Sequence, residues 1–222
     1  MFIKQLLIAA LAFASFSISG CAAIYRAEAI EGWVVDAETG KPLDGVIIVA
    51  NWELRGGLEA GIPVEQLQIF ETVTDQNGRY SFPAWGPKLA KNIGILKGNS
   101  PGILLFKPGY KFGGHSNVYW QTYGTEKFFW NKKTLKLQPF KGTPAEYAKD
   151  LRSLNSSLWG IGHENGEPCG WQSFPRMLSA LDTQYAEFRR VGVASGSVVS
   201  RLRANDSDLR SAGCKSIDDV VK

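Results

Sequence analysis

The period at which apolar residues recur changes at Pro139, and this change constrains the fold more than any other feature of the chain. From Ile30 to Pro139, short apolar runs alternate with clusters of Gly, Pro, Asn and Asp, which is typical of antiparallel strands joined by turns. After Pro139, apolar residues return every three or four positions, as on one face of a helix. We therefore predict a mainly β protein. An antiparallel β-sandwich of about seven strands occupies 30–139, and a small α-helical extension over 140–222 packs on it.

The apolar runs before Pro139 predict the individual strands. The string VIIV at 46–49 is rich in β-branched residues and suits a buried position in a sheet. Two alternating runs on either side of the string DQNG at 75–78 predict a hairpin. The connections 53–68 and 83–101 are longer than a minimal sandwich needs. The expected strands are 30–36, 45–52, 70–74, 79–82, 103–106 and 134–138, with weaker candidates at 118–121 and 128–130.

The string TPAE at 143–146 is a capping box with proline at the first helical position. It predicts a helix that ends by Gly160, after which a loop rich in Gly and Pro follows. We expect a second helix over 175–192 and short helices at 197–203 and 216–221. Few apolar residues follow Val199, so this end of the chain is expected to have little core of its own.

Two strings in the β region resemble a known family. GWVVDAETGKPLDGV at 32–46 and TDQNGRYSF at 74–82, followed by Gly109-Tyr110, are similar to the carboxypeptidase regulatory-like domain. The resemblance covers 30–139. It implies a transthyretin-like, prealbumin-type β-sandwich with an accessory, non-catalytic role.

The N-terminus resembles the signal of bacterial lipoproteins. One positive charge at Lys4 is followed by an apolar stretch over 6–16 and then by the string ISGC at 18–21, which is similar to a lipobox. The resemblance implies a signal peptide over 1–20, a lipid (diacylglycerol and palmitate) on Cys21, and a lipidated linker over 21–29. Ala22, at the position after the cysteine, favours the outer membrane, facing the periplasm. The alternative is an uncleaved spanning helix, because 5–25 carries no charge.

The other two cysteines, Cys169 and Cys214, are an even pair in a compartment that the signal predicts to be oxidising. We therefore predict a disulfide between them. Two free thiols are the second interpretation, and metal binding is the third.

Composition and motifs argue against nucleic-acid binding, metal binding and catalysis. The formal net charge of +4 is small, and the basic residues form no run longer than a pair, which argues against nucleic-acid binding. The string HENGE at 163–167 lacks the second histidine of a zinc helix, and its glycine and the following Pro168 predict a loop. We find no pattern for a cofactor, a metal or a catalytic group, and therefore predict that the chain is not an enzyme. An envelope hydrolase with an unrecognised site is kept as an alternative.

The segment 110–130 contains eight aromatic residues among Gly, Asn, Gln and Thr. Aromatic faces beside amides and hydroxyls suit sugar rings or peptides. Filling of the sandwich core is the alternative interpretation, because strands are rich in aromatic residues in any case. The candidate ligand platform consists of Tyr119, Trp120, Tyr123 and Trp130. We thus predict a lipid-anchored, non-catalytic binding or structural protein of the cell envelope, whose partner is an envelope protein, a peptide or a glycan. A carbohydrate- or peptide-binding accessory that uses 110–130 is the first alternative.

Overall fold

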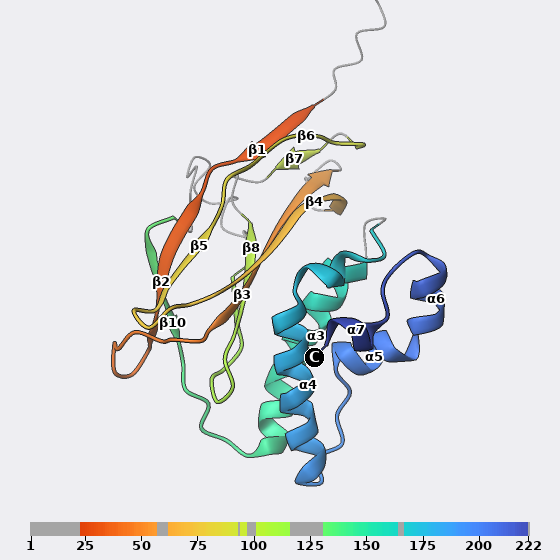
Figure 1. The fold of residues 1–222 in the computed structure, drawn as a ribbon. Helices are drawn as coiled ribbons and strands as arrows, with labels where there is room; N and C mark the ends of the chain where they lie inside the picture. Colours follow the sequence, from red (N-terminus) through yellow and green to blue (C-terminus); the bar gives the residue numbers. More distant parts are fainter. Residues whose placement is uncertain are drawn as a thin grey trace, which may run out of the picture.

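The protein is mainly β, with antiparallel sheets followed by a C-terminal helical region, as the apolar periods predict (Figure 1). The structure is a computed structural model that describes residues 23–56, 62–92, 94–96, 101–115, 131–163 and 167–221. None of the helices among these residues is long and apolar enough to cross a membrane.

Ten strands lie within the described residues, and they form three sheets. The largest sheet has the order β4-β3-β8-β9, with the short β7 paired to β3 as well, and the others have the orders β10-β2-β5 and β1-β6. Neighbouring strands are antiparallel except β10 and β2, which run parallel. The strands are β1 (Ile24–Ala27), β2 (Ile30–Asp36), β3 (Ile47–Gly56), β4 (Ile62–Val73), β5 (Arg79–Phe82), β6 (Trp85–Leu89), β7 (Ile95–Leu96), β8 (Gly102–Phe106), β9 (Gly113–His115) and β10 (Lys133–Leu137).

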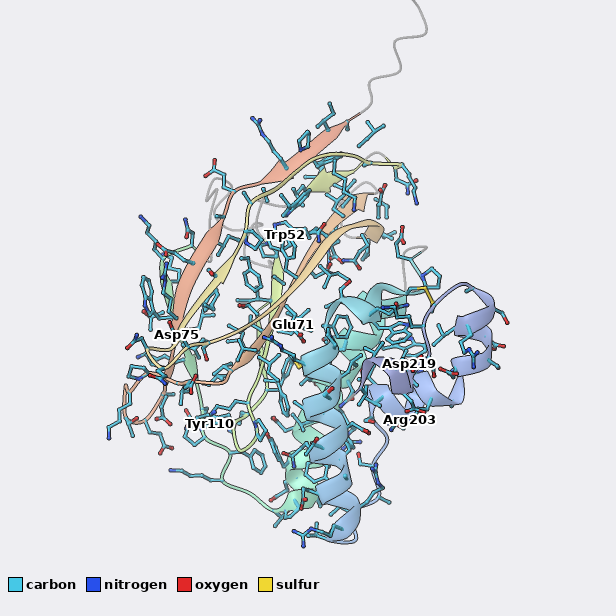
Figure 2. The ribbon with its side chains drawn as sticks, in the orientation of Figure 1. Trp52, Glu71, Asp75, Tyr110, Arg203 and Asp219 are labelled. Atoms are coloured by element: carbon cyan, nitrogen blue, oxygen red, sulfur yellow. A yellow bond between two sulfur atoms is a disulfide. The ribbon has the colours of Figure 1, made fainter. Side chains whose placement is uncertain are left out.

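The three-stranded and five-stranded sheets enclose one apolar core. Val34, Phe82 and Leu135 from the smaller sheet pack with Ile48 and Leu105 from the larger one. Trp52 of β3 lies at the centre of this core, fully buried, and its ring meets the rings of Phe70, Phe82 and Trp85 edge to face (Figure 2). Edge-to-face contacts add to the burial energy of aromatic side chains, so this cluster ties the two sheets together.

The helices cover the other face of the five-stranded sheet (Figure 1). Ile47 and Val49 of β3 and Phe106 of β8 pack against the buried faces of the two long helices. The sheet is therefore covered on both faces, which explains why β3 contains a continuous apolar run rather than an alternating one. The helices are α3 (Pro144–His163), the 3₁₀ helix η2 (Gly170–Ser173), α4 (Pro175–Arg190), α5 (Val198–Ala204), α6 (Asp206–Ser211) and α7 (Ile217–Val220).

Glu71 of β4 joins the sheet to the helical layer (Figure 2). Its carboxylate accepts hydrogen bonds from the backbone N–H groups of Arg176 and Met177, at 3.0 and 2.7 Å, in the first turn of α4. Burial raises the pKa of Glu71, while these two hydrogen bonds oppose that shift. The carboxylate thus supplies the cap that α4 lacks in its own sequence, because Phe174 at the N-cap position makes no side-chain cap.

The turns and the first helix cap form as predicted. Gly78 has a φ of +69°, and an added Cβ would lie 2.4 Å from the carbonyl oxygen of Val34, so only glycine fits this hairpin turn. The Asp75 carboxylate accepts the N–H of Asn77 within the same turn, at 2.9 Å. At the start of α3, Thr143 and Glu146 exchange side-chain to backbone hydrogen bonds of 3.3 and 2.8 Å.

Two boundaries differ from the predictions. The connection expected over 53–68 is in large part strand, because β3 and β4 continue to the pair Gly56 and Ile62. Polar residues on one face of this extension hide the strand signal: Arg55 pairs with Glu53, and Gln66 donates to Asn51. The connection expected over 83–101 likewise contains β6 and β7.

Helix α3 continues beyond Gly160, where we predicted its end, to His163. Gly162 lies inside the last turn, and a Cβ there would approach the Cβ of Trp171 to 2.8 Å. Gly162 therefore lets the backbone of η2 pack closely on the last turn of the helix.

Candidate functional site

Most of the binding residues predicted from sequence lie outside the described residues. This holds for the lipidation site Cys21 and for the platform of Tyr119, Trp120, Tyr123 and Trp130. The described start of the aromatic segment has structural contacts. The Tyr110 hydroxyl donates to the Asp36 carboxylate at 2.9 Å, and Phe112 packs on the helix-side core.

The predicted disulfide between Cys169 and Cys214 is confirmed. Their sulfur atoms lie 2.01 Å apart and their Cα atoms 5.3 Å apart, which is the geometry of a bonded pair. The bond joins the turn before η2 to the segment between α6 and α7.

No group of three or more His, Cys, Asp or Glu side chains that could hold a metal ion occurs among the described residues. The side chain of His163, the first residue of the HENGE string, lies outside the described part of the chain, as do 164–166. No described residue is therefore assigned a catalytic role, and the hydrolase alternative stays untested.

A basic crevice of about 380 Å³ lies between α3 and the segment that enters α5. We call it the α3–α5 crevice. The residues that line it are Arg152, Asn155, Ser156, Trp159, Gly196, Ser197, Val198, Ser200 and Arg201. Four of them, at 152, 155, 156 and 159, come from successive turns of one face of α3. The opposite wall comes from the first turn of α5 and the residues just before it.

The side chain of Asn155 lies at the floor of the crevice and connects its two walls by hydrogen bonds. Its side chain is 8% exposed and makes three hydrogen bonds. It donates to the Leu151 carbonyl and to the Tyr185 hydroxyl, both at 2.7 Å, and it accepts the backbone N–H of Val198 at 2.6 Å. Burial raises the pKa of Tyr185, so its hydroxyl stays protonated at neutral pH. The floor is therefore fully hydrogen-bonded and uncharged, and it fixes where α5 begins relative to α3.

Two arginines give the crevice its positive charge. The guanidinium of Arg201 lies 3.5 Å from the centre of the Trp159 ring, a cation–π contact that holds it at the wall. Arg152 lies on the facing helix, and both side chains are exposed. Neither forms an ion pair with a described residue, and no carboxylate lines the crevice. Unneutralised guanidinium groups beside serine hydroxyls can bind an anionic group through charge-assisted hydrogen bonds.

This crevice was not predicted from the sequence. Arg152, Ser156 and Trp159 do share one helical face, and that spacing was available in the sequence as a signal. The signal is weak, however, because a polar face of an amphipathic helix is usually only its solvated side. Arg201 reaches the same place through tertiary packing of α5, which no local pattern indicates.

Comparisons with known proteins yield no family for the chain. No family model matches it, and no curated protein matches it. Among solved structures, it is similar to a 3-chlorocatechol 1,2-dioxygenase from Rhodococcus opacus 1CP, with a TM-score of 0.31 and 16% identity over 55% of this chain and 62% of that one. It is also similar to a 9R-lipoxygenase from Cyanothece PCC8801, with a TM-score of 0.32 and 14% identity over 80% of this chain and 26% of that one. The chain thus covers less than two thirds of either protein, and scores this low carry no conclusion about its function.

Proposed function

We propose that this chain is a lipid-anchored protein of the cell envelope that acts by binding rather than by catalysis. The ISGC string at 18–21 and the apolar stretch before it support the anchor. The Cys169–Cys214 disulfide supports an oxidising compartment, which for a lipoprotein of the outer membrane is the periplasm. The resemblance of 30–139 to the carboxypeptidase regulatory-like domain supports an accessory role.

The binding site that we propose is the α3–α5 crevice, and its ligand is a glycan that bears carboxylate groups. One observation carries this proposal: Arg152 and Arg201 line the same open crevice, and neither has an acidic partner among the described residues. Guanidinium groups bind carboxylates in a bidentate way, and the exposed hydroxyl of Ser156 suits a hydroxyl of a sugar, whereas Ser197 and Ser200 use their hydroxyls to cap α5. The lining residues include serines but neither a histidine nor a carboxylate that could activate them, which favours binding over hydrolysis.

Metabolic labelling tests the anchor. Labelled palmitate should enter the wild-type protein and should not enter Cys21→Ser, because the thiolate of Cys21 is the expected attachment point. Equal labelling of the two proteins would contradict the proposed lipidation.

Titration calorimetry with trigalacturonate tests the crevice, with the neutral galactotriose as the matched ligand. Arg201→Ala should weaken trigalacturonate binding about ten-fold or more, because a charge-assisted hydrogen bond contributes about 1.5–3 kcal/mol. Arg189→Ala is the control, since Arg189 is exposed on α4, away from the crevice. Equal affinity for the two sugars, or an equal loss in both variants, would reject the crevice as a carboxylate site.

A further inference from the structure

Exposed apolar side chains gather at one end of the molecule. Five large apolar residues are strongly exposed among the described residues, and four of them are Ile24, Ile62, Leu89 and Ile95, at 66%, 68%, 62% and 55% exposure. Single exposed apolar residues are ordinary on protein surfaces. Four exposed apolar side chains at one end of the molecule, from four different strands, favour contact with another surface.

Strand pairing places these four residues in two groups. Ile24 of β1 lies directly opposite Leu89 of β6. Ile62 pairs with Gly56 and Ile95 pairs with Arg55, so both lie at the far end of β3, with their side chains on opposite faces of the sheet.

A hydrogen bond of 2.7 Å from the Tyr25 hydroxyl to the Gly94 carbonyl connects these two groups. Figure 1 shows β1, β6, β7 and the start of β4 together at the top of the molecule, with the helices at the lower right. We call the four side chains the apolar tip.

The N-terminal end of the described chain lies at the apolar tip. β1 begins at Ile24, so only two residues separate it from Cys21, and the three Cα–Cα steps can span at most about 11 Å. A lipid on Cys21 would therefore hold the start of β1, and with it the apolar tip, within about 11 Å of the bilayer surface. Arg26 is exposed on the same strand, two residues after Ile24, and forms no ion pair with a described residue. A free cation beside apolar side chains suits anionic lipid headgroups.

We infer that the apolar tip inserts into the interfacial zone of the membrane that carries the anchor. The inference depends on the proposed lipidation of Cys21. Insertion of the tip orients the β-sandwich away from the bilayer, so that the helical layer and its α3–α5 crevice face the aqueous compartment. The lipid supplies the attachment, and the tip sets the orientation.

Lipid photolabelling tests this orientation. The mature, lipidated protein is reconstituted into vesicles of phosphatidylethanolamine and phosphatidylglycerol that contain a lipid with a diazirine near its headgroup. After irradiation, mass spectrometry locates the adducts. Peptides that contain Ile24, Leu89 and Ile95 should carry about ten-fold more label than the peptide with Val191, because only the tip enters the interface. Val191 is a fair reference, since it is 50% exposed and lies outside the tip.

The double variant Ile24→Ser/Leu89→Ser should lower labelling at Ile95 several-fold, whereas Val191→Ser should leave it unchanged. Equal melting temperatures of the three proteins will show that the fold is kept. The intact mass of each sample reports whether Cys21 carries lipid. A sample without lipid would reject the proposed anchor, whereas a lipidated sample labelled equally at the tip and at Val191 would overturn the membrane-facing tip alone.

Discussion

Asp36 ends the first long strand and holds the turn that follows it. One carboxylate oxygen accepts the backbone N–H groups of Glu38 and Thr39, at 2.9 and 2.8 Å, and the other accepts the Tyr110 hydroxyl. The hydrogen bond from the Thr39 backbone is the largest cause that lowers the pKa of Asp36 below its ordinary value of 3.8. This single side chain therefore connects the turn after β2 with the turn after β8.

The lowered pKa of Asp36 predicts a loss of stability in acid. Because the folded pKa lies below the unfolded one, the ionised carboxylate stabilises the fold above about pH 4, and this contribution disappears as the pH falls through the folded pKa. Melting temperatures measured from pH 7 to pH 2 should fall less steeply for Asp36→Asn than for the wild type. Parallel curves for the two proteins would contradict the assigned role.

Asn155 is the residue on which the geometry of the crevice depends. Asn155→Ala leaves the Val198 N–H and the Tyr185 hydroxyl without this partner in a buried place, and should cost about 3 kcal/mol of unfolding free energy. Tyr185→Phe is the control, because it removes one hydroxyl and keeps the bond to Val198, at a cost of about 1 kcal/mol. Urea unfolding measures both values. An equal, small loss in the two variants would mean that α5 is positioned by packing alone.

The short C-terminal helices have more support than their length suggests. Val199, Leu202, Leu209 and Ile217 are buried in the helix-side core, so this segment, which has little core of its own, packs on the core of the long helices. Arg203 of α5 adds a two-pronged ion pair to Asp182 of α4, at 2.9 Å for each bond. The disulfide fastens the same segment to η2.

Removal of the disulfide should loosen this segment more than the rest of the chain. The bond closes a separation of 45 residues, so Cys169→Ser/Cys214→Ser should lose about 4 kcal/mol in the chain-entropy model. Hydrogen exchange should become faster in α6 and α7 first, because they pack through few side chains, while β3 stays protected. Uniformly faster exchange along the chain would instead indicate that the bond supports the whole fold.

The described residues form three main layers, which are the three-stranded sheet, the five-stranded sheet and the helices. The five-stranded sheet contributes one face to each core, so the sandwich and the helices share it. The Glu71 carboxylate adds a polar link across the second of these interfaces. The predicted division at residue 139 therefore separates a sandwich that has a core of its own from helices whose core includes one face of the larger sheet.

A chain that ends at residue 139 should consequently fail to form a stable, soluble domain. It would expose Ile47, Val49, Ile69, Leu104 and Phe106, and each loses about 2 kcal/mol when it returns to water. Circular dichroism and size-exclusion chromatography should detect unfolding or aggregation of the truncated chain and a single unfolding transition for the full one. A monomeric fragment that melts cooperatively would refute this shared core.

Local patterns were sufficient for features that depend on neighbours in sequence. The class of fold, the turns at 36–42 and 75–78, the cap of α3 and the position of α4 follow from side-chain period, glycine conformation and capping chemistry, all of which act over a few residues. The disulfide followed from cysteine parity and compartment, although its geometry did not.

Contacts between residues distant in sequence determined the strand and helix lengths, the crevice and the apolar tip. The length of β3 and β4 depends on hydrogen bonds across a pair whose polar face hides the strand period. The continuation of α3 to His163 depends on how closely Trp171 packs against Gly162. The α3–α5 crevice exists because Asn155 binds Val198, 43 positions away. The apolar tip likewise depends on pairing within two different sheets and on the hydrogen bond from Tyr25 to Gly94 that connects them. Such contacts leave no periodic trace in the chain, because their free energy depends on spatial distance and not on separation along the sequence.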